Sequence, residues 1–182
     1  EEIWSRNFTN LFIAPLKLKE IIVALIFTAL IRTLIGLVPA IILTSPLFGV
    51  SILELGFPLL LLFLSLYIFG ITLGLFVSAG LIRFGPSFEN IAWSSLFLLA
   101  PLGCIYYPIE ILPNFFQIVA KCLPLVYIFD ETRNILLNGI INYENLKHAY
   151  LLNLVYLILG IFLFYLSFLK ARIKGTLINM GE

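Results

Sequence analysis

Residues 56–82 read GFPLLLLFLSLYIFGITLGLFVSAGLI and contain no Asp, Glu, Lys or Arg. The hydrocarbon core of a bilayer is about 30 Å thick, and a helix needs roughly 20 apolar residues to cross it. Backbone polar groups find no partners in lipid, so a crossing segment must satisfy them within itself as a helix. A strand of a membrane barrel would instead alternate apolar and polar residues. This run therefore predicts an all-α integral membrane protein.

Three further apolar stretches are predicted to cross, at residues 21–44, 91–106 and 149–169. The whole chain is 62% hydrophobic and 12% charged, whereas soluble domains are about 45–50% apolar and about 25% charged. A chain of this composition cannot cover its apolar surface with polar side chains, so lipid must be its solvent. The formal net charge of +1 is too small for a basic surface that binds nucleic acid. We predict a single transmembrane domain over residues 1–182, with four spans.

Lys and Arg residues alternate between the two sides of these spans. Lys17 and Lys19 precede the first span, Arg83 lies between the second and third, and Lys170 follows the last. Cytoplasmic connections carry an excess of Lys and Arg. Both termini and the turn at 83–90 are therefore predicted to face the cytoplasm, in a multi-pass protein of the inner (plasma) membrane.

Residues 107–140 are too interrupted by proline to cross the membrane and too apolar for an ordinary soluble loop. Pro108, Pro113 and Pro124 favour helix starts and breaks over one continuous helix. Gly139 stands where a second short helix would stop. Two short helices joined at Pro124 are predicted to form an extracytoplasmic re-entrant hairpin that dips into the outer leaflet. The alternative is an external loop that lies on the lipid interface.

Arg32 is the one charged residue inside the first predicted span, near the middle of the bilayer. A charge at this depth costs about 2.5–3.5 kcal/mol on insertion scales, so such residues usually face the interior of a bundle. One hypothesis is that Arg32 lines a conduit and binds an anionic group of a substrate. The alternative is a structural role, with hydrogen bonds to neighbouring carbonyl groups or a span whose centre is shifted.

The hairpin carries charged residues whose role is predicted to be structural support rather than substrate contact. Glu131 and Arg133 form a local ion pair, or Arg133 holds the two short helices together. Cys104 and Cys122 are expected to be two buried free thiols, and a disulfide between them is the alternative. His148 is the only histidine, and neither H-E-x-x-H nor G-x-S-x-G occurs, which argues against an intramembrane enzyme.

The order of these features resembles the membrane subunits of ABC-2 type transporters. In that family a Pro-(apolar)-Leu-Pro element, an Asn/Leu-Pro-Leu step, an acidic-x-x-Arg turn and a Gly precede the last span. The matching residues are Pro108, Leu112 and Pro113 for the first element, Leu123, Pro124 and Leu125 for the second, Glu131, Arg133 and Gly139 for the rest, and Ala14, Pro15 and Leu16 for an N-terminal Ser/Ala-Pro-Leu step. Glu131 lies one residue closer to Arg133 than is common, and Asp130 restores the spacing. Leu123 and Asn7 stand where the family more often has Asn and Gly.

The resemblance implies a six-span, type V exporter-like helical bundle, of which this chain supplies spans three to six. The first two spans would then be missing from the given sequence, which lacks an initiator Met. Residues 1–20 would form a cytoplasmic coupling segment that docks on an ATPase through an apolar helical stripe. The residues of this segment are Trp4, Phe8, Leu11 and Phe12, followed by Pro15. A helix that lies on the inner lipid surface is the alternative.

The family works as two permease subunits on two cytoplasmic ABC ATPases, so the resemblance implies a homodimer with ATPase partners. No G-x-x-x-x-G-K-[ST] phosphate loop occurs here. ATP and Mg²⁺ are therefore expected on the partner, with no cofactor, metal or catalytic residue on this chain. The expected function is export of an amphipathic or lipophilic, drug-like or lipid-like substrate by alternating access. The alternatives are export of a lipid-linked polysaccharide or polyol, and a channel or membrane scaffold without ATP coupling.

Overall fold

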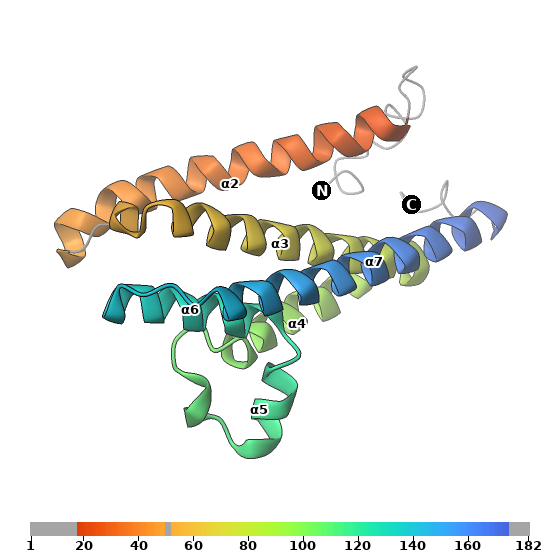
Figure 1. Cartoon of the computed structure of the whole chain (residues 1–182). Coiled ribbons are helices and arrows are strands. Elements are labelled where there is room, and N and C mark those ends of the chain that lie inside the picture. The colour runs from red at the N-terminus through yellow and green to blue at the C-terminus, as the bar shows by residue number, and fades with distance from the viewer. Residues whose placement is uncertain (1–17, 50–51, 175–182) are drawn as a thin grey trace. The chain divides into compact units, whose positions relative to one another are not determined.

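The computed structural model describes residues 18–49 and 52–174, and every regular element within them is a helix (Figure 1). The chain divides into two compact units. One consists of residues 1–53 together with 172–182, and the other of residues 54–171. The described part of the first unit is chiefly α2, and the second unit holds the remaining long helices.

Helix α2 spans Leu18–Phe48 and contains Pro39 and Pro46. It extends beyond the predicted span of 21–44 at both ends, and its Val23–Leu47 part is long and apolar enough to cross a membrane. Side chains along this part are largely exposed within the unit. Such a surface suits a lipid environment, because exposed Leu, Ile and Phe in such numbers would be unfavourable in water.

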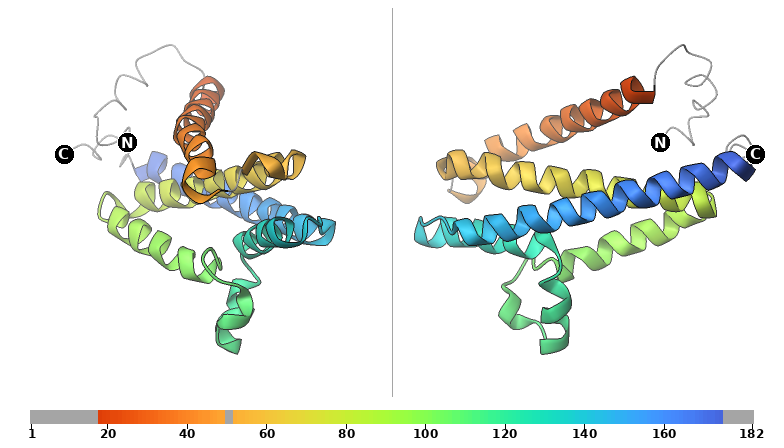
Figure 2. Two further views of the ribbon diagram at one scale, coloured as in Figure 1. Left: turned by 90° about the vertical axis from the view of Figure 1, so that its left-hand side faces the viewer. Right: turned by 45° about the vertical axis from the view of Figure 1, so that its right-hand side comes forward.

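Helices α3 (Phe57–Phe84) and α7 (Tyr143–Lys174) form the long framework of the second unit (Figure 2). Both are apolar enough to cross a membrane. Four contacts join them in sequence order: Leu61 with Tyr150, Ser65 with Asn153, Phe69 with Tyr156, and Leu75 with Gly160. Because the residue numbers rise together on both helices, α3 and α7 run parallel.

Helix α4 (Phe88–Leu102) follows α3 after a short turn at Gly85, whose φ is +79°. A Cβ atom on Gly80 would overlap the ring of Phe88, so glycine permits the close approach of α3 and α4. Since a helix rises 1.5 Å per residue, the 15 residues of α4 cover about 22 Å, less than the thickness of the hydrocarbon core. The predicted span at 91–106 is therefore not among the three helices that are long enough to cross.

Helix α4 ends before the predicted span does, because Cys104 adopts a left-handed backbone conformation with a φ of +54°. The N–H of Ile105 donates to the carbonyl of Ala100 (3.5 Å), and the N–H of Cys104 donates to that of Pro101 (3.2 Å). This pair of bonds is the Schellman pattern that ends helices, with Cys104 at the position usually occupied by Gly. Residues 103–106 are therefore a turn, not the last part of a span.

The predicted pair of short helices is present between α4 and α7. A 3₁₀ turn at Ile109–Ile111 follows Pro108, α5 covers Asn114–Ala120 after Pro113, and α6 covers Pro124–Asn138. Pro124 occupies the first turn of α6, where its missing N–H costs no hydrogen bond. Figures 1 and 2 show α5 projecting from the other helices of the second unit, while α6 lies beside α3.

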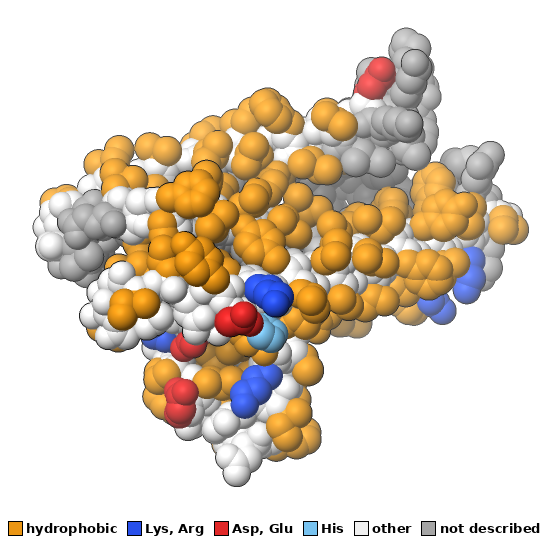
Figure 3. All heavy atoms as spheres, viewed as in Figure 1, with side chains coloured by type: hydrophobic (Ala, Val, Ile, Leu, Met, Phe, Trp, Pro, Cys, Tyr) orange, Lys and Arg blue, Asp and Glu red, His pale blue; other side chains and the backbone are white. Residues whose placement is uncertain are grey.

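The core of the second unit lies where α3, α6 and α7 meet. Leu62, Ile128, Leu146 and Ala149 form a buried cluster there. Elsewhere, hydrophobic side chains cover most of the face seen in Figure 3, and charged side chains gather around α5, α6 and the start of α7 and again at the far end of α7. The polar chemistry of this unit is thus concentrated near the two ends of its long helices.

Candidate functional site

Helices α6 and α7 form an antiparallel hairpin whose connection is only four residues long, 139–142. Gly139 ends α6 in the left-handed conformation (φ +66°), and its N–H donates to the carbonyl of Ile135 at 2.9 Å. Asn142 then caps α7, since its side-chain oxygen accepts the N–H of Glu144 at 3.0 Å. The predicted helix stop at Gly139 is confirmed, and the start signal at Asn142 was missed although Asn is a preferred capping residue.

Glu131, a residue of α6, forms hydrogen bonds to the start of α7. Its carboxylate accepts the backbone N–H of Asn142 at 2.6 Å and the side-chain amide of Asn145 at 3.2 Å. The side chain is fully buried. Both donors belong to the first turn of α7 or the residue before it, where backbone N–H groups lack helical partners and the helix dipole favours a negative group. Glu131 therefore holds α6 against the start of α7.

Arg133 joins α6 to the turn that follows α4. One of its guanidinium nitrogens, Nη1, donates to the carbonyl of Cys104 at 2.8 Å. The other, Nη2, lies 3.6 Å from a carboxylate oxygen of Asp130. The predicted ion pair between Glu131 and Arg133 is wrong, because residues two apart project from different sides of a helix, whereas Asp130 is three residues away and shares a face with Arg133. The hydrogen bond of Arg133 runs to the turn after α4, and its role in holding the two short helices together stays a prediction.

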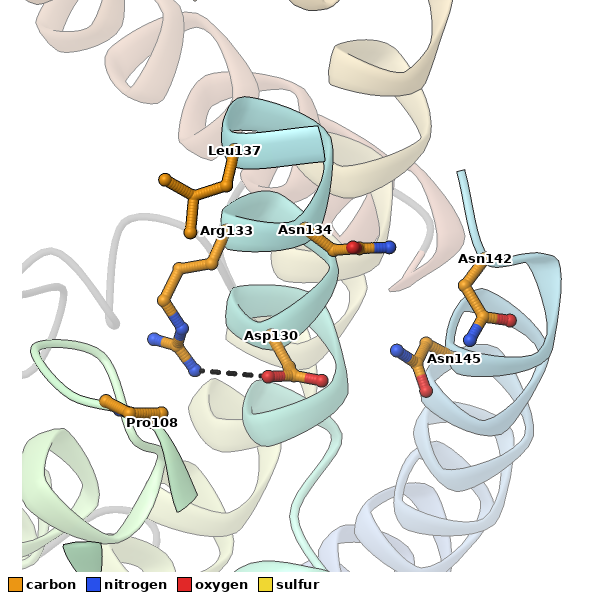
Figure 4. Close-up of a pocket in the computed structure, with 7 residues that line it drawn as sticks. All are labelled: Pro108, Asp130, Arg133, Asn134, Leu137, Asn142 and Asn145. Atoms are coloured by element: carbon orange, nitrogen blue, oxygen red, sulfur yellow. Dashed lines mark ion pairs between the residues drawn. The ribbon is translucent and has the colours of Figure 1, made fainter. Parts of the chain in front are cut away.

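A groove of about 550 Å³ opens beside this ion pair. Figure 4 shows Arg133 and Leu137 on the side toward Pro108, and Asn142 and Asn145 on the side toward α7. The full lining is Pro108, Asp130, Arg133, Asn134, Leu137, Asn142 and Asn145. The lining residues comprise two with charged side chains, three with amide side chains and two with apolar side chains. We call this feature the α6–α7 groove.

The charged pair in the groove is only partly covered. Side-chain exposure is 26% for Arg133 and 47% for Asp130. The Nη2 atom of Arg133 is nevertheless enclosed and meets no hydrogen-bond acceptor among the described residues. A buried donor of this kind is uncommon in folded proteins, where nearly all such atoms have a partner. The Nη2 donor therefore has no hydrogen-bond partner among the described residues, and its nearest charged neighbour is the Asp130 carboxylate at 3.6 Å.

The two cysteines differ in their surroundings. Both are free thiols, but Cys104 is fully buried and Cys122 is exposed. The prediction of two buried thiols is therefore half correct. Burial raises the pKa of the Cys104 thiol, and the neighbouring Arg133 guanidinium opposes this rise.

Other predicted residues lie outside the groove. Arg32 is exposed near the middle of α2, in the other unit of the chain, and its substrate role stays a prediction. The coupling residues Trp4, Phe8, Leu11, Phe12 and Pro15 lie outside the described residues. Across residues 18–49 and 52–174, no group of three or more His, Cys, Asp or Glu side chains gathers as a metal site would require.

The sequence model of the ABC-2 type transporter family matches residues 2–137, which are 136 of the 182 residues of this chain. The chain belongs to this family. It is a multi-pass membrane protein, and members of the family are the membrane subunits of ABC transporters, which work with an ATPase subunit. Comparisons with curated proteins and with solved structures give no match to the chain.

Proposed function

We propose that this chain is the permease subunit of an ATP-driven exporter that moves an amphipathic or lipophilic substrate out across the inner (plasma) membrane. A homodimer of the permease would form the conduit, and separate ABC ATPase chains would carry ATP and Mg²⁺. The family membership supports the class of transporter. The proposed membrane topology depends on one observation, which is that α3 and α7 run parallel.

Two parallel helices that both cross a membrane require the chain to return between them. Residues 85–142 are the only part of the chain that connects α3 to α7, so they must include a crossing in the opposite direction. Helix α4 leaves the end of α3 and is the longest helix of the connection with an apolar sequence. At about 22 Å it is a short span, and a bilayer adapts to a short span by local thinning. A crossing between α3 and α7 supports four spans in the chain.

The charges support one orientation of these spans. Arg83 at the end of α3 and Lys170 near the end of α7 are both exposed and, because the helices are parallel, lie at the same end of the second unit. Cytoplasmic ends are enriched in Lys and Arg. With that end inside, α3 and α7 cross inward, α2 crosses outward, and the α6–α7 groove faces the outside.

The apolar surface of residues 103–123 supports contact with the outer leaflet, either as a re-entrant hairpin or as a loop on the lipid interface. Six large apolar side chains of this segment are exposed within the second unit: Tyr106, Ile111, Phe115, Phe116, Ile118 and Val119. An aqueous loop would lose free energy by exposing these groups, at about 25 cal/mol for each Å² of apolar area. Burial in lipid at the outer interface removes this cost.

The proposed mechanism is alternating access. The ATPases would act on the coupling segment of residues 1–20, and cargo must bind the inward and outward states unequally for ATP hydrolysis to drive transport. Export of a lipid-linked polysaccharide or polyol is the second candidate, and the charged and amide residues among those that line the α6–α7 groove favour it.

Purification of the full chain with its ATPase tests this proposal. We expect an ATPase that carries a phosphate-loop motif to co-purify in a fixed ratio and to change its hydrolysis rate when the permease is present. Phe8→Asp should abolish both effects, because it places a charge in the predicted stripe. Asn10→Asp is the matched control, since residue 10 projects from the opposite side of the predicted helix. A chain that conducts without nucleotide, and that associates with no ATPase, would contradict the proposal.

A further inference from the structure

We propose that Arg83 and Lys170 bind the phosphate group of an anionic phospholipid, at the end of the second unit where α3 stops. This site goes beyond the proposed export function, because neither residue lines the α6–α7 groove or belongs to the coupling segment. Only the assignment of the lipid to the cytoplasmic leaflet rests on the orientation proposed above. The inference depends on the register of α3 and α7, on the absence of counter-ions and on the length of α3.

The contact between Leu75 and Gly160 sets the heights of the two basic residues. A Cβ atom on Gly160 would lie 3.4 Å from the Cβ of Leu75, so the two helices meet face to face there. Arg83 lies eight residues beyond Leu75, and Lys170 lies ten residues beyond Gly160. At 1.5 Å per residue these separations are about 12 and 15 Å along parallel helices. The two side chains therefore begin at nearly the same height.

The two side chains also project from the same side of the helix pair. Each residue of an α-helix turns by about 100°, because 3.6 residues complete one turn. Arg83 is therefore rotated by about 80° from the direction of Leu75, and Lys170 by about 80° in the opposite sense from that of Gly160. Because the helices run parallel and face each other, these opposite rotations lead to one side. Figure 3 shows Lys and Arg side chains gathered at this end of the visible face.

Neither basic side chain is neutralised by the described part of the chain. Both are exposed, and no Asp or Glu among residues 18–49 and 52–174 lies within ion-pair distance of either. Glu89, the acidic residue closest to Arg83 in the sequence, accepts the indole N–H of Trp93 at 3.4 Å. The guanidinium carbon of Arg83 lies 5.4 Å from the centroid of the Phe84 ring, and this stacking leaves its N–H edges open. Two neighbouring cations without a counter-ion attract an anion.

The length of α3 places Arg83 at the height of lipid phosphate groups. Its 28 residues extend about 42 Å, which matches the roughly 40–45 Å of a bilayer with its head groups. Arg83 is the second-last residue of this helix, so it lies in the head-group region.

Apolar side chains next to the two cations favour a lipid over a free phosphate ion or an acidic protein surface. Leu166 and Leu163 precede Lys170 by four and seven residues and share its face of α7. Phe84, beside Arg83, is 64% exposed. These side chains suit the acyl chains of a lipid, which a phosphate ion and a protein surface both lack.

Native mass spectrometry of the purified full chain tests the site. The protein in detergent is mixed with equal amounts of phosphatidylglycerol and phosphatidylcholine that carry the same acyl chains, and the two lipid adducts are compared. Each basic residue near an anionic lipid surface contributes a factor of about five in affinity. The preference for phosphatidylglycerol should therefore fall about fivefold in Arg83→Gln and about 25-fold in Arg83→Gln/Lys170→Gln. Arg83→Lys keeps the charge and should keep most of the preference.

Lys121→Gln/Lys147→Gln is the matched control. It removes the same charge from two exposed lysines near the opposite ends of the long helices, and the lipid preference should persist. The proposal is overturned if Arg83→Gln/Lys170→Gln keeps the wild-type preference, if the lysine control loses it equally, or if inorganic phosphate at the lipid's concentration displaces phosphatidylglycerol. No ATPase is present, so the result is separate from that of the co-purification test. An unchanged lipid preference with loss of the ATPase in the double variant would assign the two residues to a protein contact instead.

Discussion

Replacement of Glu131 by alanine is the sharpest test of the hairpin. The substitution removes the acceptor of the Asn142 N–H (2.6 Å) and of the Asn145 amide (3.2 Å) in a site where the side chain is fully buried. Each donor left without a partner costs about 1–3 kcal/mol, and the lost side-chain volume adds to this cost. The expected loss in the free energy of unfolding is therefore about 3–5 kcal/mol.

The Glu131→Gln variant distinguishes the contribution of the hydrogen bonds to stability from the contribution of the charge. Glutamine keeps one oxygen for the Asn142 N–H, and the Asn145 amide can rotate to accept from the new NH₂ group. Only the charge-assisted part of the two bonds is lost, so the expected cost is about 1 kcal/mol. Glu144→Ala changes an exposed acidic residue of the same hairpin and should alter stability by less than about 0.5 kcal/mol.

Thermal unfolding of the purified chain in nanodiscs, followed by its helical signal, measures these differences. One kcal/mol corresponds to about 2–4 °C for a chain of this length, so Glu131→Ala should lower Tm by about 10 °C. The Asn145→Ala variant and the Glu131→Ala/Asn145→Ala double variant complete a thermodynamic cycle, in which the losses should fall short of additivity by about 1 kcal/mol. The assigned role of Glu131 is refuted if Glu131→Ala behaves like Glu144→Ala, or if Glu131→Gln costs as much as Glu131→Ala.

Three further predictions concern single contacts. Gly139→Ala should cost about 1 kcal/mol by Tm, because the left-handed backbone opposes a Cβ even though the space around it is open; Gly139→Asn should cost less, and an unchanged alanine variant would contradict the assigned helix end. At neutral pH, maleimide followed by mass spectrometry should label exposed Cys122 and not Cys104, since burial covers Cys104 and raises its thiol pKa, so that little of the reactive thiolate forms; equal labelling would contradict the buried turn. Asn153→Ala should cost only about 1 kcal/mol in Tm measurements, because its two bonds to Ser65 lie between membrane helices, where such bonds average about 0.6 kcal/mol; Ser65→Ala in the same background should then add little, and full additivity would argue against the pairing.

Several helix boundaries of the second unit could be predicted from the local sequence. Pro113 and Pro124 restrict their own backbone and their neighbours, so the starts of α5 and α6 could be predicted from the sequence. Gly139 is equally local, because a left-handed residue at a helix end is a property of one position. The apolar runs likewise predicted the three long helices, since lipid leaves no other regular structure for them.

Partners of side chains were less predictable. Asp130 rather than Glu131 pairs with Arg133, and the spacing along a helix contained this information. The acceptor of Arg133 Nη1 is the carbonyl of Cys104, which is 29 positions away in the sequence, and no local pattern indicates such a contact. The left-handed conformation of Cys104 also conflicts with its residue type, so the end of α4 could not be read from the sequence.

The sequence by itself determined that this chain is an all-helical membrane protein, where its helices break, and which family it belongs to. These properties depend on the transfer of apolar side chains into lipid and on the backbone limits of single Pro and Gly residues. The parallel pairing of α3 and α7, the shortness of α4 and the α6–α7 groove were decided only by the tertiary structure. They depend on contacts between residues far apart in the chain, whose free energy appears only when the helices have packed.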